Sequence, residues 1–437
     1  MTRVYAAFVG CKVSQADSET ALAQLAAAGL EPTASREEAD VCLLMTCGVT
    51  AEAERKSRRL ARRLAQDGRR VFVAGCAATL RAAQFEHPGV EVVDAEDLIG
   101  LADRIVSSAT GVSDRRAATD PETGTAVPAP RGRTRFTLKV QDGCDGACSY
   151  CVVRLVRGRP RSAPLARVVA AARDALAEGC GEVVLSGIDL GAYRDAEGVG
   201  TAPGGVADLA DLVRALVHLP GLLRLRLSSL EPHHIDDRLL EELAHPRVAR
   251  HLHVPLQSAD DDVLRAMRRR YTVAQYLDVA ERVRSRLGDA MLSTDVIVGF
   301  PTEDEAAYAR TQAVLESGLF GRAHVFAYSS RPGTAAADLY QLPPAVVRTR
   351  AAAAGVTARE AQRRAATDAL GRRAEVLIEE RRDGHWRGYS SQYVRYYLSG
   401  PAQPGRLVDA VAEGLHGDGV RGRVEDAPGR GATDDDE

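Results

Sequence analysis

The chain has 437 residues, of which 45% are hydrophobic and 27% are charged, the mixture that is typical of globular domains. This composition excludes a wholly disordered chain or a fibre, and no apolar run approaches the roughly 20 residues of a membrane helix. The net charge of −3, from 57 basic and 60 acidic residues, neither requires nor excludes a nucleic-acid partner. The length predicts two or three domains. Residues 1–10 are too short for a signal peptide and resemble a strand, so we expect a cytoplasmic protein.

Short apolar segments alternate with helical segments in the first hundred residues. The expected strands cover residues 4–9, 41–45, 70–74 and 90–93, and the expected helices cover about 18–28, 51–66 and 80–85. This alternation predicts a doubly wound parallel sheet in an N-terminal domain of residues 1–106. Cys11, Cys47 and Cys76 each follow one of the first three strands. We therefore expect them at the edge of the sheet where ligands bind in this fold class.

A second alternation of strands and helices occupies residues 134–344, after a linker at 107–133 that is rich in Ser, Thr, Pro, Gly and charge. The expected strands are 136–140, 182–185, 223–227, 251–256, 292–298 and 323–327. Six βα units in about 200 residues predict a partial (β/α)6 barrel, whose working loops lie at the carboxyl ends of the strands.

The last part of the chain differs in composition. An Arg/Ala-rich connecting helix is expected over residues 345–370. Five short strand-like pieces with Gly and Pro between them follow in residues 371–424 and predict a small β-barrel. Residues 425–437 hold six acidic side chains and one arginine, and we expect this tail to be disordered.

The cysteines are the most informative residues, because disulfides are not expected in a large cytoplasmic protein. Cys144, Cys148 and Cys151 lie on the loop that follows the first barrel strand. Three thiolates at this spacing can hold three corners of an iron–sulfur cubane and leave the fourth iron open to a small molecule such as S-adenosylmethionine. The alternative is structural zinc, which requires four ligands, and the loop offers no fourth Cys or His.

The remaining five cysteines fall into two groups. Taken singly, Cys11, Cys47 and Cys76 would more often be core residues than ligands. Their shared position at strand ends instead predicts a second site with three thiolates. Cys42 lies inside a strand and Cys180 precedes one, so we expect both to be structural.

The spacing of Cys144, Cys148 and Cys151, with Tyr150 before the third cysteine, resembles the radical S-adenosylmethionine (SAM) superfamily. Several surrounding segments and the N-terminal cysteines resemble the methylthiotransferase family, and the C-terminal unit resembles the RNA-binding TRAM barrel. The segments are residues 140–144, 157–162, 185–191, 226–232, 254–258, 294–301 and 330–334.

The resemblance implies SAM and two 4Fe–4S clusters as cofactors. It implies that the cluster on Cys144, Cys148 and Cys151 reduces SAM to a deoxyadenosyl radical, which removes hydrogen from an unactivated carbon. It also implies that the second site, on the N-terminal cysteines, carries the sulfur that is methylated and transferred. A reductant such as flavodoxin or ferredoxin is an expected partner, and a membrane is not.

Five residues at or near the carboxyl ends of successive barrel strands are expected to contact SAM. They are Tyr150, Ser186, Gly187, Gln257 and Asp295. The alternative is that Ser186 and Gly187 only shape a turn and that Asp295 is a satisfied acid of the core.

Two segments suggest RNA binding. Residues 55–63 form a basic helix, whose alternative is an ordinary solvated face. In the TRAM-like unit, aromatic residues alternate with arginines and could stack on unpaired bases. Some of these aromatics must form the core of the small barrel, so we expect about two of the five to reach RNA. The aromatics are Trp386, Tyr389, Tyr393, Tyr396 and Tyr397, and the arginines are Arg382, Arg387 and Arg395.

The family modifies an adenosine next to the tRNA anticodon or an aspartate of a ribosomal protein. Residues 46–50 and 56–58 resemble the branch that acts on threonylcarbamoyladenosine, and residues 331–334 fit the tRNA branches. We therefore predict transfer of a methylthio group to carbon 2 of threonylcarbamoyladenosine in the tRNA anticodon arm. Isopentenyladenosine in tRNA is an alternative. A small natural product is another, because Met45, Arg154, Ala259 and Thr302 differ from the family's usual residues. The third alternative is a non-enzymatic, metal-stabilised RNA-binding protein.

Overall fold

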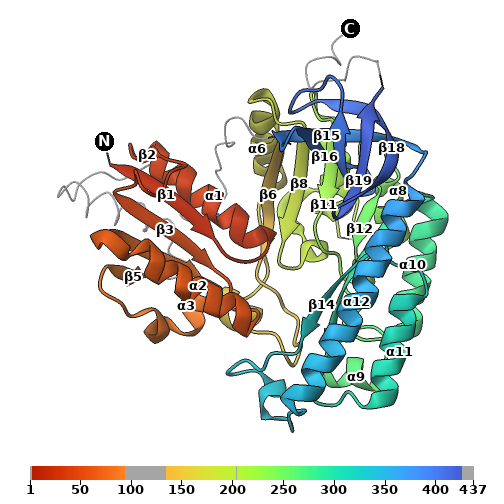
Figure 1. Cartoon of the computed structure of the whole chain (residues 1–437), viewed down its shortest axis with the longest axis horizontal. Helices are drawn as coiled ribbons and strands as arrows, with labels where there is room; N and C mark the ends of the chain where they lie inside the picture. The colour runs from red at the N-terminus through yellow and green to blue at the C-terminus, as the bar shows by residue number, and fades with distance from the viewer. Residues whose placement is uncertain (1, 94–133, 203, 426–437) are drawn as a thin grey trace.

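A computed structural model describes residues 2–93, 134–202 and 204–425, and this part of the chain forms three units (Figure 1). The predicted linker at 107–133 and the tail beyond residue 425 lie outside the described residues. The predicted fold class is confirmed: two α/β units are followed by a small β-barrel. Within the described residues, no helix is long and apolar enough to cross a membrane.

The N-terminal unit is a parallel five-stranded sheet in the order β2-β1-β3-β4-β5. Its strands are β1 (Arg3–Phe8), β2 (Glu31–Pro32), β3 (Val41–Thr46), β4 (Arg70–Gly75) and β5 (Val90–Val92). Its helices are α1 (Lys12–Ala27), α2 (Ala51–Leu64) and α3 (Cys76–Leu80). Leu43 packs in one core with Leu25 of α1, whereas Cys42 packs in another with Leu64 of α2. Helices thus cover both faces, and Cys42 is a core residue as expected.

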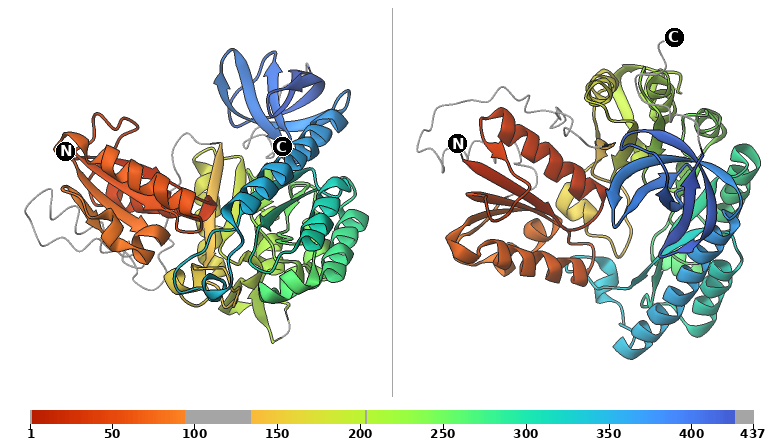
Figure 2. Two further views of the ribbon diagram at one scale, coloured as in Figure 1. Left: turned by 60° about the horizontal axis from the view of Figure 1, so that its bottom comes forward. Right: turned by 45° about the horizontal axis from the view of Figure 1, so that its top comes forward.

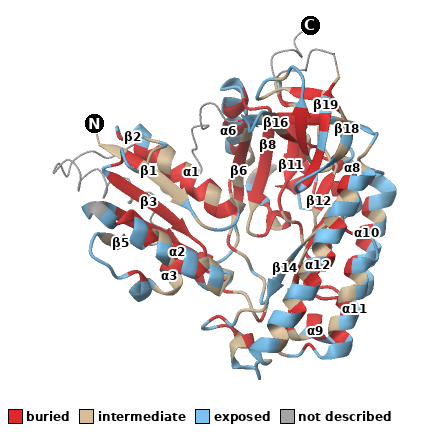
Figure 3. Ribbon diagram, in the orientation of Figure 1, coloured by how far each residue is buried: buried red, intermediate tan, exposed pale blue. Residues whose placement is uncertain are grey.

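The central unit is a partial barrel of six parallel strands. They are β6 (Arg135–Asp142), β8 (Glu182–Gly187), β11 (Arg224–Leu227), β12 (His251–His253), β13 (Met291–Val298) and β14 (Arg322–Ala327). The first three pair in one sheet with the short antiparallel β7 (Arg161–Ser162), and the last three form a second sheet. Isolated parallel bridges at Leu225–Val248 and Ser229–His253 join the two sheets. The buried strands face one large core that also contains Cys180 (Figure 3).

Helices alternate with these strands along the chain. They are α5 (Val153–Arg157), α6 (Leu165–Ala177), α7 (Leu209–Val217), α8 (Asp237–Leu243), α9 (Asp261–Ala266), α10 (Val273–Leu287) and α11 (Glu305–Glu316). A hairpin of β9 (Arg194–Val199) and β10 (Val206–Asp208), which the sequence patterns did not predict, precedes α7.

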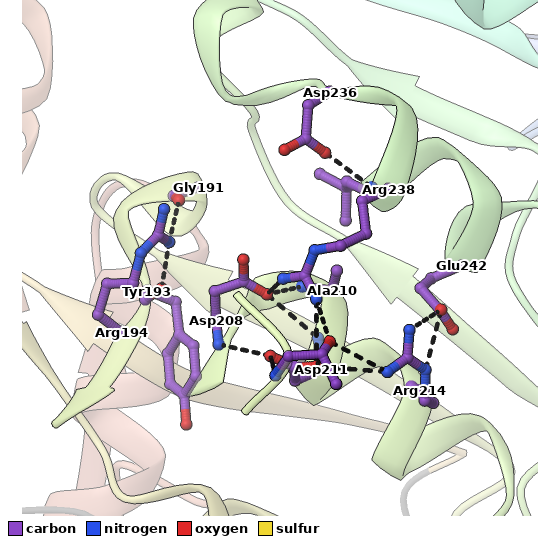
Figure 4. A network of polar contacts seen from close by, with 12 residues as sticks. Gly191, Tyr193, Arg194, Asp208, Ala210, Asp211, Arg214, Asp236, Arg238 and Glu242 are labelled. Carbon is purple, nitrogen blue, oxygen red and sulfur yellow. Dashed lines mark hydrogen bonds and ion pairs between the residues drawn. The ribbon is translucent and has the colours of Figure 1, made fainter. Parts of the chain in front are cut away.

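A polar network fixes that hairpin to α7 and α8 (Figure 4). The Asp208 carboxylate caps α7 by accepting from the amide of Ala210 at 2.9 Å, and the Asp211 carboxylate accepts from the amide of Asp208 at 3.2 Å. Arg214 of α7 and Arg238 of α8 both pair with Asp211, at 3.4 and 3.2 Å. The two carboxylates thus accept hydrogen bonds from backbone amides that have no partner within the helix. The network therefore stabilises one flank of the barrel.

The long helix α12 (Pro344–Asp368) leads from the partial barrel to the C-terminal unit (Figure 2). That unit is a closed barrel in the order β15-β16-β17-β19-β18. Its strands are β15 (Arg373–Arg382), β16 (His385–Ser390), β17 (Arg395–Ser399), β18 (Leu407–His416) and β19 (Gly419–Val424). Arg224, the first residue of β11, donates to the carbonyl oxygen of Tyr389 at 2.9 Å. The small barrel thus docks at the amino ends of the parallel strands, opposite the ends that carry the cysteine loop.

Candidate active site

The loop that carries Cys144, Cys148 and Cys151 begins directly after β6, at a position that requires glycine. Gly143 has φ of 71°, and a Cβ atom there would lie 2.1 Å from the carbonyl oxygen of Arg159. Only glycine combines this left-handed conformation with so close an approach of two backbone segments. The Cys144 amide then donates to the carbonyl oxygen of Gly158 at 3.2 Å. The start of the loop is therefore fixed against the segment that follows α5.

Backbone amides and one arginine point at the sulfur atoms of this loop. The amide of Gly146 donates to the Cys144 sulfur at 3.2 Å, and that of Val153 donates to the Cys151 sulfur at 3.4 Å. The Arg269 guanidinium donates to the Cys148 sulfur at 3.3 Å. Donors of this kind stabilise thiolates, which are the form of cysteine that binds metal.

The N-terminal cysteines lie at the strand ends where the topology argument expected them. Cys11 is the N-cap of α1, Cys47 follows β3, and Cys76 is the first residue of α3. Gly10 has φ of 133°, and a Cβ atom there would lie 2.6 Å from the Cβ of Cys47. The ends of β1 and β3 can therefore approach one another only because this residue has no side chain.

The chemistry of both triads fits an iron–sulfur cluster. All six cysteines are free of disulfides. Burial raises the pKa of Cys47 and Cys151 to about 12 and that of Cys144 to about 11, because a low-dielectric site disfavours the thiolate. Stable thiolates at neutral pH therefore require the positive charge of a bound metal.

The spacing of the sulfur atoms favours a cluster over zinc, the alternative that the sequence left open. In the described part of the chain, two groups of three metal-binding side chains have all their ligand atoms within 4.8 Å of one another. Neither group is one of the cysteine triads. A zinc ion with Zn–S bonds of about 2.3 Å places its sulfur ligands about 3.8 Å apart. A cubane spreads its ligands more widely, because each thiolate binds a different iron atom.

Three of the five residues expected to contact SAM line one cavity with Cys151. Tyr150, Gln257 and Asp295 surround this space of about 140 Å³. The Tyr150 ring packs edge-on against Phe300, with ring centroids 6.5 Å apart. The remaining lining residues are Val49, Thr50, Val152, Ile297, Phe326, Ala327, Tyr328 and Ser329. Because Val49 and Thr50 follow Cys47 closely, the cavity is shared by the barrel and the N-terminal unit.

Ser186 and Gly187 lie at the end of β8 and outside the lining of that cavity. Ser186 is fully buried, and its hydroxyl has no hydrogen-bond partner within the described residues, a property it shares with the Ser228 hydroxyl just beyond β11. Buried hydroxyls normally have partners. These two orphaned groups at adjacent strand ends fit a site that a polar ligand such as SAM completes.

Asp295 does not stand alone in the core. Its carboxylate lies 3.2 Å from Nε2 of His253, whose Nδ1 lies 2.9 Å from the Ser293 hydroxyl. His324 on β14 completes a group of three side chains that face the barrel interior. Sequence reasoning missed both histidines, although the period-two alternation of β12 and β14 places them on the inner face.

Buried ion pairs join the N-terminal unit to the barrel. Arg331 donates to the Glu54 carboxylate at 2.7 Å, and the two side chains are 5% and 4% exposed. Arg157 donates to the Asp17 carboxylate of α1 at 2.7 Å. Arg157 and Arg331 lie in segments that carry the family resemblance, but neither was predicted to be a contact between units.

The structure sorts the aromatic residues of the C-terminal barrel. Tyr396 lies in its core. Tyr393 stacks on His251 at the floor of the partial barrel, with ring centroids 4.9 Å apart, and Tyr389 stacks on Tyr393 at 4.7 Å. Tyr397 is also buried, and its hydroxyl donates to the Asp418 carboxylate at 2.7 Å, whereas Trp386 is partly buried against the barrel core. Arg381 lies over the Trp386 ring at 5.3 Å, and Arg387 lies over the Tyr397 ring at 5.4 Å.

The basic helix is α2, and some of its basic side chains pair with acidic residues of the same helix. Arg55 and Lys56 pair with Glu52, and Arg58 pairs with Glu54. Ser57 is fully buried. Arg59, Arg62 and Arg63 are exposed to solvent. Arg55 and Lys56 are exposed as well, so their surface pairs with Glu52 do not exclude them from contact with a separate partner.

Comparison with known proteins agrees with this architecture. Residues 138–313 match the radical SAM superfamily, and residues 3–94 match the uncharacterized protein family UPF0004. A tRNA-2-methylthio-N(6)-dimethylallyladenosine synthase from Cereibacter sphaeroides is 35% identical over 91% of this chain and 93% of its own length. The threonylcarbamoyladenosine tRNA methylthiotransferase MtaB from Thermotoga maritima is 31% identical over 90% of both chains.

Among solved structures, the radical SAM methyltransferase TsrM from Kitasatospora setae shares the fold. It covers 77% of this chain and 75% of its own, with a TM-score of 0.55 and 14% identity. The chain is thus an enzyme, and the non-enzymatic alternative falls. SAM and two 4Fe–4S clusters are the cofactors of this class of enzyme. On this evidence, the chain belongs to the family of radical SAM methylthiotransferases.

Proposed function

We propose that this enzyme adds a methylthio group to carbon 2 of a modified adenosine beside the tRNA anticodon, with threonylcarbamoyladenosine as the first candidate. The observation that carries the proposal is a cavity beside Cys151 that the barrel and the N-terminal unit line together. Its lining combines Val49 and Thr50 from the N-terminal unit with Tyr150 and Cys151 from the barrel. A transferred group and a reacting carbon must meet within a few ångströms, and a cavity that both units line meets this requirement.

The chain's own residues have distinct parts in this proposal. Cys144, Cys148 and Cys151 would hold the SAM-cleaving cluster, and Cys11, Cys47 and Cys76 the second cluster. When bound, SAM and the two clusters supply the radical and the methylthio group. Tyr150, Gln257 and Asp295 would orient SAM in the cavity that they line, and Ser186 and Gly187 would contact it at the end of β8.

Side chains inside the barrel support threonylcarbamoyladenosine. Arg322 and His324 alternate along β14 and so share one face of the strand, and His324 lies beside His253 with ring centroids 5.8 Å apart. Together they offer hydrogen-bond donors and positive charge, which suit the carboxylate of a threonyl group. An isopentenyl group offers these side chains no hydrogen-bond acceptor.

Isopentenyladenosine is the second candidate. The curated relative with 35% identity is named for the dimethylallyl substrate. Val49, Ile297 and Phe326 give the shared cavity an apolar side that would suit such a group.

Nucleoside mass spectrometry after an anaerobic assay distinguishes the candidates. The reconstituted enzyme is given SAM, a reductant and tRNA that carries either modification. We expect the methylthio derivative of threonylcarbamoyladenosine. The isopentenyl product alone would establish the second candidate, and no methylthio product from either tRNA would refute the tRNA proposal. A Cys11/Cys47/Cys76→Ala variant serves as the control, because it should form deoxyadenosine but no methylthio product.

A further inference from the structure

Each cysteine triad has one buried arginine that donates a hydrogen bond to one of its sulfur atoms. Nε of Arg157 lies 3.4 Å from the Cys76 sulfur, and Nη1 of Arg269 lies 3.3 Å from the Cys148 sulfur. Both arginine side chains are only 5% exposed. Neither contact was expected from the sequence, since 81 residues separate the first pair and 121 the second.

Arg157 is held in place by carboxylates from two units. Its Nη2 donates to the Asp17 carboxylate at 2.7 Å, and its Nη1 donates to both Asp142 oxygens at 3.1 Å. Lys139 pairs with the same two carboxylates. All five N–H donors of a guanidinium lie in one plane, so these bonds fix the direction of the N–H that faces Cys76.

Arg269 is anchored in a similar way at the other triad. It pairs with the Glu231 carboxylate, and its Nε donates to the Tyr271 hydroxyl at 3.2 Å. Its Nη1 also lies 3.3 Å from the Tyr150 hydroxyl. The guanidinium is thus enclosed between the cysteine loop and the segment after α9, and solvent screens its charge very little.

We propose that Arg157 and Arg269 are positioning residues that raise the reduction potentials of the two clusters, each acting on its own. The inference rests on the two cluster sites of the proposed function. Reduction adds negative charge to a cluster that three thiolates already make anionic. A buried guanidinium that donates to one of those sulfurs stabilises the reduced form more than the oxidised form, and hydrogen bonds to sulfur are a recognised determinant of cluster potential.

Arg157 lies close in sequence to one triad and contacts the other. This residue ends α5, six positions after Cys151, yet its sulfur contact is to Cys76 of the N-terminal unit. One short segment therefore carries a ligand of the first site and a donor to the second. The two effects remain separable, because Arg269 contacts only the Cys148 site.

The test is a redox titration of each cluster, followed by electron paramagnetic resonance. A Cys144/Cys148/Cys151→Ala background leaves the N-terminal cluster alone, and a Cys11/Cys47/Cys76→Ala background leaves the other. Arg157→Gln should shift the potential of the N-terminal cluster to a more negative value, and Arg269→Gln should do the same for the SAM-cleaving cluster. In the otherwise wild-type chain, each change should leave the potential of the other cluster in place.

The chain offers a matched control for each position. Arg154 is exposed on the same helix as Arg157, and Arg270 follows Arg269 but pairs with the exposed Asp145. Arg154→Gln and Arg270→Gln should leave both potentials unchanged. Arg157→Lys and Arg269→Lys keep the charge but not the directed N–H, so they should give smaller negative shifts than the glutamine variants.

The outcomes separate failure of this inference from failure of the proposed function. Glutamine variants that bind full iron with unmoved potentials would show that the arginines only stabilise the packing around the two sites. If a glutamine variant does not take up iron, the potentials of the lysine variant and of Arg157→Gln/Asp17→Asn are measured instead. The double variant removes one charge of each sign, and unmoved potentials in these variants would again refute the inference. A wild-type chain that binds no iron under anaerobic reconstitution would refute the proposed function itself.

Discussion

Gly143 lies where the chain leaves β6 for the cysteine loop, and the space around it is already filled by backbone. Gly10 has the same role at the N-terminal triad, where the Cβ of Cys47 is the close neighbour. At both positions the residue type determines whether two segments of the chain beside the sulfur ligands can come this close. Charge matters at the residue scale as well. Glu54 and Arg331 are buried between the two units, and loss of either side chain would leave the charge of the other uncompensated.

Gly143→Ala should lower the iron content of the reconstituted enzyme by about half, because one of two 4Fe–4S clusters is lost. A methyl group at this position would lie 2.1 Å from a carbonyl oxygen, so the loop must move. Iron analysis and deoxyadenosine formation measure the effect. Gly179→Ala is the control, since Gly179 also has positive φ, 92°, but nothing within 4 Å. Full iron in the Gly143 variant would contradict the argument.

Glu54→Ala should reduce the free energy of unfolding by about 3–5 kcal/mol, because it leaves the Arg331 guanidinium buried without its carboxylate. Denaturant titration of the reconstituted enzyme measures the change. Glu52→Ala on the same helix is the control, since Glu52 is 56% exposed and its pairs should contribute less than about 1 kcal/mol. Equal losses of unfolding free energy for the two variants would mean that the buried ion pair stabilises the fold no more than the exposed pairs do.

At the scale of elements, α2 shows how one helix serves two purposes. Its buried side packs on β3 and β4 and carries Glu54 toward the barrel, while Arg59, Arg62 and Arg63 face solvent. The Thr50 hydroxyl caps the helix by accepting from the Ala53 amide at 3.1 Å. Because the helix begins just after Cys47, its exposed arginines lie on the unit that contributes the second triad.

The triple change Arg59/Arg62/Arg63→Ala should weaken tRNA binding at low salt and reduce the slope of log affinity against log salt by about 2–3, the loss expected for three phosphate contacts. Filter binding over a salt series measures both quantities. The control replaces three exposed arginines of α12, namely Arg359, Arg363 and Arg364. An unchanged slope in the α2 variant would leave this face as an ordinary solvated surface.

At the scale of the whole molecule, the C-terminal barrel is fixed to the floor of the partial barrel. Tyr393 has φ of 69°, unusual for a tyrosine, and inserts between His251 and Tyr389. Arg226 lies over its ring at 4.5 Å. An aromatic stack with a buried cation makes this junction a rigid one. The barrel therefore has a set orientation relative to the site.

Tyr393→Ala should loosen this junction and cost on the order of 3 kcal/mol of unfolding free energy, the usual range for deleting a packed aromatic ring. Hydrogen exchange should become faster in β16 and β17, while β3 and β4 of the N-terminal unit keep their protection. Tyr340→Ala is the control, because Tyr340 is 85% exposed. Slow exchange in β16 and β17 of the Tyr393 variant would show that other contacts hold the barrel.

The sequence could predict much of the fold because its information is local. Alternating strand and helix patterns identified both α/β units, and the rule for parallel sheets brought Cys11, Cys47 and Cys76 to one edge. The hairpin β9–β10 was missed because its residues carry no clear alternation and its stability comes from the network around Asp211. His253 and His324 were missed because the local pattern of the short strands β12 and β14 does not show which polar side chains meet Asp295.

The sequence by itself predicted which cysteines would bind iron and determined that the chain forms two α/β units and a small β-barrel, since spacing and periodicity depend on neighbouring residues alone. Only the tertiary structure decided which aromatic rings of the C-terminal barrel are buried, which arginines face the sulfurs, and that the N-terminal unit and the partial barrel line one cavity together. Those properties arise from the docking of units far apart in the chain. Arg157 illustrates the difference: its motif was visible in the sequence, but its position between Asp17, Asp142 and Cys76 exists only after two units have packed together.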